Sequence, residues 1–92
     1  MMTPLAWSPK KANAYLDYDV DWRQYLEANE LIVSQDATVA LGSIEVDRVQ
    51  QSNGVVLLWI GGGVKNQLAK VLVTIETNAG RTEAVEVTLP II

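Results

Sequence analysis

The residues that decide the fold run from Val55 to Arg81, and read VVLLWI (55–60), GGG (61–63), VKNQLA (64–69), KVLVTIET (70–77) and NAGR (78–81). Two runs rich in Val, Ile and Leu are separated by glycine, and Asn78-Ala-Gly80 supplies a second turn signal. Apolar, β-branched runs bounded by turn residues are typical of paired strands. The stretch therefore predicts the centre of a small all-β domain.

The triple glycine at 61–63 raises the alternative of a phosphate-binding loop. Such a loop needs a lysine followed by Ser or Thr, at set spacing, at the start of a helix. Here Val64-Lys65-Asn66-Gln67 follows the glycines, with no hydroxyl after the lysine and a strand pattern beyond. We interpret Gly61–Gly63 as a flexible turn between strands.

Upstream of this stretch, residues 14–22 alternate with period two. Leu16, Tyr18, Val20 and Trp22 fall on one face, and Asp17, Asp19 and Asp21 fall on the other. This pattern predicts a strand with one solvated side. Carboxylates at i, i+2 and i+4 also suggest a calcium site, because calcium binds oxygen ligands. A strand spaces alternate side chains roughly 7 Å apart, however, which is too far for all three to bind one ion.

The rest of the chain supplies further short strands with turn signals between them. Residues 30–41 form either one long strand with a bulge or two short ones, and the phase slip at Val49 predicts a bulge or an edge strand. Asn53-Gly54 is the strongest hairpin signal, because both central residues of a type I′ turn need positive φ. About seven strands predict an antiparallel two-sheet sandwich, in which Trp59 is a candidate central aromatic.

Near the N-terminus the period changes once more. Trp22, Tyr25 and Leu26 have i, i+3, i+4 spacing after Asp21, which predicts one short helical turn. Before it, residues 1–13 read as an extended arm, because Pro4 and Pro9 favour extended neighbours, and residues 14–92 read as the sandwich domain. The arm is either a frayed terminus or a peptide that lies on another protein, as Trp is enriched at interface hot spots. With the apolar C-terminal tail, the candidate partner-binding residues are Leu5, Trp7, Lys10, Lys11, Ile91 and Ile92.

Composition excludes several classes of function. The 92 residues include no Cys and no His, which removes disulfides, thiolate chemistry and the commonest general base and zinc ligand. The net charge is −4 with 7 scattered basic residues, whereas a nucleic-acid binder shows a basic stripe. No apolar run reaches the length of a membrane helix, and the N-terminus lacks the pattern of a signal peptide. We expect no catalysis, cofactor, metal, nucleic acid or membrane, and we expect synthesis and folding in a reducing cytoplasm.

Two separated segments resemble one family. The first holds Lys11, Leu16-Asp-Tyr18, Val20-Asp-Trp22 and Tyr25-Leu26, and the second holds Trp59-Ile-Gly-Gly62, Val71–Thr77 and Ala79-Gly-Arg81-Thr82. In this order they are similar to the small virion proteins known as phage fibre–tail adaptors. The resemblance covers residues 10–87 and departs from the family pattern at Val33–Val39 and near Leu68–Lys70.

The resemblance implies an immunoglobulin-like β-sandwich that serves as a structural virion protein of a tailed bacteriophage. Such a protein would be an adaptor in the tail or neck that attaches fibres or neighbouring tail components, in several copies, with other virion proteins as partners. The alternatives are a capsid decoration protein and a bacterial Ig-like or fibronectin-type binding module. The first cannot be separated from the adaptor by sequence, and the missing signal peptide counts against the second.

Overall fold

The structure is a computed structural model that describes residues 5–92, so Met1–Pro4 of the expected arm lie outside the described residues. The described chain contains strands and turns and no helix. Its seven strands are β1 (Leu5–Ala6), β2 (Leu16–Asp21), β3 (Ile32–Leu41), β4 (Ile44–Ser52), β5 (Val55–Gly62), β6 (Leu68–Thr77) and β7 (Thr82–Pro90).

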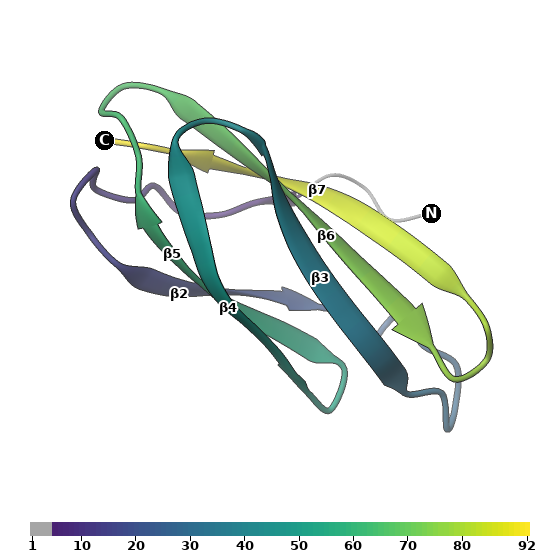
Figure 1. Cartoon of the computed structure of the whole chain (residues 1–92). Helices are drawn as coiled ribbons and strands as arrows, with labels where there is room; N and C mark the ends of the chain where they lie inside the picture. The colour runs from purple at the N-terminus through teal and green to yellow at the C-terminus, as the bar shows by residue number, and fades with distance from the viewer. Residues whose placement is uncertain (1–4) are drawn as a thin grey trace.

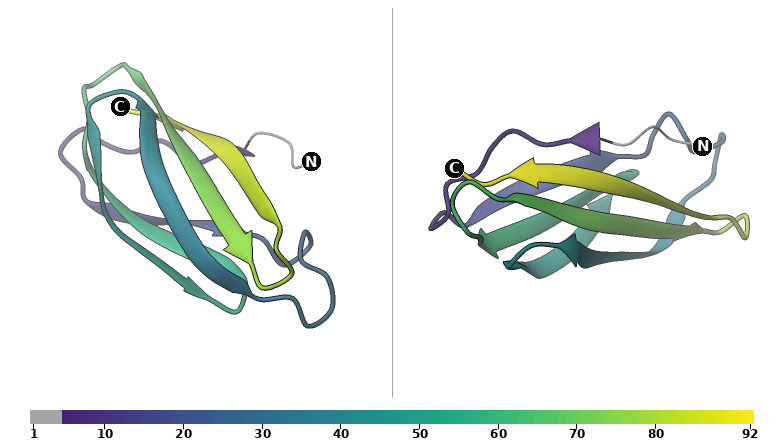
Figure 2. Two further views of the ribbon diagram at one scale, coloured as in Figure 1. Left: turned by 45° about the vertical axis from the view of Figure 1, so that its right-hand side comes forward. Right: turned by 90° about the horizontal axis from the view of Figure 1, so that it is seen from above.

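The strands form two packed sheets, with the orders β1-β7-β6-β3 and β2-β5-β4 (Figure 1). Figure 2 shows the two layers lying over one another when the molecule is seen from above. The second sheet has the order of strands B, E and D of an immunoglobulin domain, and β3, β6 and β7 correspond to C, F and G. The predicted immunoglobulin-like sandwich of about seven strands is therefore confirmed, with β1 added in parallel to β7.

The turns predicted from glycine and asparagine are where the sequence places them. Asn53 and Gly54 have φ values of 52° and 85°, as a type I′ turn requires, and they join β4 to β5. The phase slip near Val49 corresponds to a register shift between Val46 and Arg48, where β4 has a bulge against β5. Residues 32–41 form one long strand, β3, with register shifts near each end.

The core lies between the sheets and is made almost entirely of aliphatic side chains. Alternate residues of β5, β6 and β7 contribute most of it, because period two directs every second side chain inward. Its fully buried members include Val56, Leu58, Ile60, Val71, Val73, Val87 and Leu89.

Trp22 is the central aromatic of this core, with an exposed fraction of 0%. The expectation that Trp59 fills this role is wrong, because Trp59 is only half-buried. Its register partner Asp17 lies on the outer face of β2, and paired residues share a face. Trp59 therefore points out of the sandwich.

The short helical turn expected after Asp21 is also wrong. The backbone N–H groups of Tyr25 and Leu26 both donate to the carbonyl of Trp22, at 2.9 and 3.1 Å, and the next backbone hydrogen bond, from Glu30 to the carbonyl of Glu27, closes a separate turn. The segment is a hydrogen-bonded turn instead. Trp22 is buried and contacts Tyr25 edge-on at a centroid distance of 5.6 Å. This packing fixes the conformation of the segment, and the i, i+3, i+4 spacing alone does not predict it.

Candidate functional site

The described part of the predicted arm lies on the chain's own sandwich. Leu5 and Ala6 pair in parallel with Val87 and Thr88 of β7. The ring of Trp7 packs on Tyr18 at a centroid distance of 5.0 Å, and its Nε1 donates to the carbonyl of Asp19 at 2.9 Å. Leu5 and Trp7 thus connect β7 of one sheet to β2 of the other, and each remains half-buried.

Lys10 is buried, with an exposed fraction of 0%. Its Nζ donates to the carbonyls of Gly62 and Lys11, at 2.6 and 2.8 Å. Burial lowers the pKa of this amine. The backbone of Lys10 continues the same attachment, since its N–H donates to Pro90 and its carbonyl accepts from Ile92.

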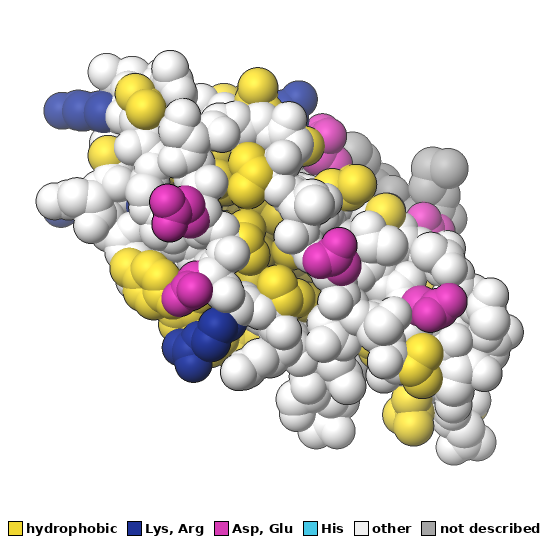
Figure 3. Space-filling view, viewed as in Figure 1, with side chains coloured by type: hydrophobic (Ala, Val, Ile, Leu, Met, Phe, Trp, Pro, Cys, Tyr) yellow, Lys and Arg dark blue, Asp and Glu magenta, His cyan; other side chains and the backbone are white. Residues whose placement is uncertain are grey.

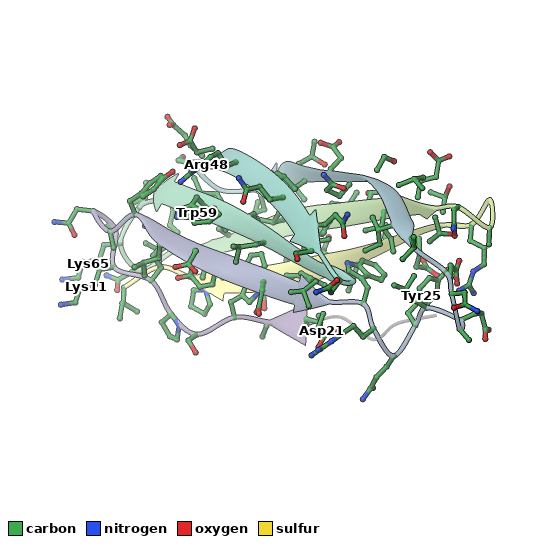
Figure 4. The ribbon with its side chains drawn as sticks, turned by 90° about the horizontal axis from the view of Figure 1, so that it is seen from below. Lys11, Asp21, Tyr25, Arg48, Trp59 and Lys65 are labelled. Carbon is green, nitrogen blue, oxygen red and sulfur yellow. The ribbon has the colours of Figure 1, made fainter. Side chains whose placement is uncertain are left out.

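The other predicted partner-binding residues lie close to Lys10, at one end of the molecule. Ile91 is buried, whereas Ile92 is 52% exposed and Lys11 is exposed. Figure 4 shows Lys11 beside Lys65 at this end, with Tyr25 toward the opposite end. Of the six predicted residues, Lys11 and Ile92 therefore present accessible side chains, Leu5 and Trp7 present part of theirs, and Lys10 and Ile91 belong to the core.

The outer face of the β2-β5-β4 sheet carries a surface that sequence reasoning missed. Val55, Leu57 and Trp59 of β5 point outward and are half-buried. A Cβ built on Gly61 would lie 3.1 Å from Cδ1 of Tyr15, so this tyrosine ring covers the next outward position. We call Tyr15, Val55, Leu57 and Trp59 the apolar stripe. It spans roughly 20 Å along the strand.

Two polar residues of β4 hold members of the apolar stripe in place. The guanidinium of Arg48, on β4, lies 4.4 Å from the centroid of the Trp59 ring, a stacked arrangement that Figure 4 shows at the labelled pair. The hydroxyl of Tyr15 donates to Oδ2 of Asp47 at 2.6 Å, and this hydrogen bond raises the pKa of the tyrosine.

The run VVLLWI contains the signal that could have revealed the apolar stripe. Six consecutive apolar residues place apolar side chains on both faces of a strand. Strands of this kind are normally covered on both sides, but the sandwich covers the inner face of β5 alone. An apolar outer face on a central strand is a sign of a partner surface.

A row of carboxylates borders the apolar stripe on β2. Asp17 faces Trp59 and Asp19 faces Leu57 across the strand pair. Beside them is a hollow of about 360 Å³, which is lined by Trp7, Ser8, Asp17, Tyr18, Asp19 and Leu57. The ion pairs among residues 5–92 are Asp21–Arg23, Lys70–Glu86 and Glu30–Arg81, so Asp17 and Asp19 are not paired with a cation of the described chain.

A second apolar surface follows the seam where the sandwich opens between β3 and β4. Figure 3 shows hydrophobic side chains along this seam. β3 is bonded to β6 and β4 to β5, so each is an edge strand whose other side is unpaired within the described chain. Val33 is 59% exposed, and Leu31, Val39 and Leu41 are also exposed. Such edges are suited to receive an extended chain.

At the end of the molecule opposite Lys11, four residues join the turn after β2 to the β6–β7 hairpin. We call these residues, Tyr25, Glu30, Thr77 and Arg81, the clasp. The Nε of Arg81 donates to Oε2 of Glu30 at 2.9 Å, its Nη2 donates to Oε1, and the Thr77 hydroxyl donates to Oε2. Arg81 also stacks over the Tyr25 ring at 4.4 Å. The Glu30 side chain is only 2% exposed, whereas that of Arg81 is 36% exposed.

The clasp should make stability depend on acid pH. Hydrogen bonds from Arg81, Thr77 and the backbone N–H of Glu27 lower the pKa of Glu30 from 4.5 to about 2. The unfolded chain therefore binds this proton at a higher pH than the folded chain does. The contribution of the clasp to the free energy of unfolding should be complete above the pKa that Glu30 has in the unfolded chain. It should be lost progressively as the pH falls from 4.5 toward about 2.

Melting temperatures of the wild-type chain and Glu30→Gln, measured at about pH 7 and about pH 3, check this prediction. Glu30→Gln should melt lower at the higher pH and should lose less on acidification. Arg23 also lowers the pKa of Asp21. Because both proteins contain this pair, its effect on the melting temperature cancels in the comparison. Equal losses on acidification would contradict the role of Glu30.

Within residues 5–92 there is no group of three acidic residues placed to hold a metal ion. The same residues include no helix that could span a membrane. The described surface offers an apolar stripe with a carboxylate border and an open edge seam, and the clasp joins two loops at one end of the molecule.

The two segments of the family motif meet in space at both ends of the sandwich. Asp17 pairs with Trp59 at one end, and Tyr25 contacts Arg81 at the other. A rigid immunoglobulin-like sandwich with uncovered apolar surfaces defines a structural, protein-binding domain. The family model described as "Podophage GP4 fiber-tail adaptor protein gp77" matches residues 10–90.

The chain belongs to this podophage fibre–tail adaptor family, which confirms the resemblance. It is thus a structural protein of the phage virion, with an adaptor role in the tail and with other tail or fibre components as partners. The family is one of structural phage adaptors. No curated protein sequence matches the chain.

Proposed function

We propose that the chain attaches fibres, or the components that carry them, to the phage tail, and that several copies do so around the tail. The observation that carries this proposal is the family match, which covers nearly the whole sandwich. Attachment requires two docking surfaces held in a fixed arrangement, and it requires no chemical reaction.

The molecule supplies two separate surfaces of this kind. The apolar stripe lies on the outer face of the β2-β5-β4 sheet, and the seam lies where β3 and β4 diverge. Each surface is apolar and is not covered by another segment of the described chain. Docking would therefore remove apolar surface area from water, which is favourable. One surface facing the tail and another facing a fibre component is the minimum that an adaptor needs.

The terminal residues contribute to docking in two ways under this proposal. Lys11 and Ile92 contact partners directly, and Leu5 and Trp7 present their exposed parts. Lys10 and Ile91 hold this end of the molecule in shape from inside, because both are buried.

Particles made without this chain test the proposal. A stop codon in its gene, in a host that does or does not supply the tagged chain from a plasmid, gives matched particle preparations. We expect particles that lack the chain to keep capsid and tail but to lose fibres, and cryo-electron microscopy of complemented particles to place the tag in several copies around the tail. A tag spread over the capsid shell, with fibres unaffected in its absence, would indicate a decoration protein and overturn the proposal.

A further inference from the structure

We infer that the apolar stripe and its carboxylate border together receive a basic segment of a neighbouring virion protein, one that presents lysine or arginine beside apolar side chains. This inference rests on the proposed function and adds the chemistry of the partner. It assigns the β2-β5-β4 face, rather than the termini alone, as a docking surface.

The first support is the contrast between the two outer faces of the sandwich. On the four-stranded sheet, β6 presents Lys70, Thr74 and Glu76 outward, interspersed with the exposed apolar residues Leu68 and Leu72. On the three-stranded sheet, every outward residue of β5 from 55 to 59 is apolar. Since both faces are solvated in the described chain, the apolar stripe is the face whose composition indicates a protein cover.

The second support is the charge beside the stripe. Asp21 is neutralised by Arg23 at 2.7 Å, and Asp47 accepts from Tyr15. Arg48 is occupied with Trp59. This leaves Asp17 and Asp19 as exposed carboxylates without a cation among residues 5–92. A partner that brings positive charge to this border is electrostatically complementary, and one that brings negative charge is excluded.

The third support is the shape of the border. The hollow beside Asp17 and Asp19 is walled by the apolar groups of Trp7 and Leu57. Lysine and arginine have the matching character, with an apolar stem and a charged head. The stem would lie against Trp7 and Leu57 while the head reaches a carboxylate, and neighbouring apolar residues of the same segment would cover Trp59 and Val55.

A second hollow of about 360 Å³ on the opposite sheet supplies a matched control. It also contains two carboxylates, Asp36 and Glu76. Its other lining residues are Ser34, Gln35, Thr74, Ile75 and Thr82, and none of them belongs to the apolar stripe. Charge reversal there changes the net charge of the chain by the same amount without touching the apolar stripe.

Co-sedimentation of purified chain with particles made without it tests the inference. The wild-type chain should bind, Asp17→Lys/Asp19→Lys should bind at least about tenfold more weakly, and Asp36→Lys/Glu76→Lys should bind like the wild type. Raising the salt from about 50 to about 500 mM should weaken the wild type more than Asp17→Asn/Asp19→Asn. Circular dichroism confirms that each variant is folded.

The outcomes separate the two proposals. Wild-type binding that is unaffected by the Asp17/Asp19 reversal overturns this inference and leaves the adaptor function standing. Failure of the wild-type chain to bind overturns the adaptor function and the inference with it. Self-association of the free chain that the reversal abolishes, seen by sedimentation velocity, would assign the surface to a second copy and also overturn the inference.

Discussion

Replacing Trp22 by alanine is expected to remove about 3–5 kcal/mol from the free energy of unfolding, the range for a large aromatic deleted from a core. Trp22 is the largest of the fully buried side chains, and no disulfide exists to limit the loss. A domain of this size has roughly 5–15 kcal/mol in total. The melting temperature should fall by roughly 15–30 °C, or the chain should fail to fold at the growth temperature of the host.

Urea and thermal denaturation followed by circular dichroism measure this loss. Trp59→Ala is the matched control, because it deletes the same side chain from the half-exposed outer face and should cost much less. Trp22→Phe should cost less than Trp22→Ala, since it keeps an aromatic ring and removes an indole Nε1 that has no acceptor among the described residues. Equal losses for Trp22→Ala and Trp59→Ala would contradict the assignment of Trp22 as the central aromatic.

Removing residues 1–12 is expected to destabilise the sandwich by about 3–6 kcal/mol, counted from several backbone hydrogen bonds at roughly 1 kcal/mol each and two half-buried side chains. The lost hydrogen bonds join Trp7 to Thr88, Lys10 to Pro90 and Ile92, and Ala12 to Ile92. The lost side-chain contacts include Trp7 on Tyr18 and the Nζ of Lys10 on the carbonyl of Gly62. The truncation would also uncover the edge of β7 that β1 occupies.

Melting temperatures of the full chain and two truncations check this prediction. Removal of residues 1–4 alone ends before β1 and keeps every contact named above, so it serves as the control. A freely extended arm would leave the melting temperature unchanged in both truncations. That result would contradict the packing of residues 5–12 on the sandwich and would leave both sequence-based interpretations of residues 1–13 open, a frayed terminus and a peptide that lies on another protein.

Much of the fold follows from the sequence because strand and turn signals are local. The alternation in β2, the Asn53-Gly54 turn and the apolar runs of β5 and β6 each depend on residues a few positions apart. Period two and the conformational freedom of asparagine and glycine are sufficient to predict them. The family resemblance added the immunoglobulin-like topology, which the strand order of the two sheets confirms.

The site residues were harder to predict because their roles depend on contacts between distant parts of the chain. Leu5, Trp7 and Lys10 have the composition of an interface arm, but the parallel pairing of β1 with β7 and the hydrogen bond from Lys10 to Gly62 place this segment on the sandwich. The opposite error occurs at β5, which has the composition of a strand that is buried on both faces. The sandwich covers one face and leaves the apolar stripe uncovered.

The sequence by itself determined that this chain is a small all-β domain without His or Cys, and in which order its strands and turns occur. Only the tertiary structure decided that Trp22 rather than Trp59 lies in the core, and that Lys10 is buried. It also decided that Glu30 meets Arg81, 51 residues away in the chain. The physical reason is that local periodicity sets the direction of a side chain relative to its own strand, whereas burial depends on which other segment packs over it.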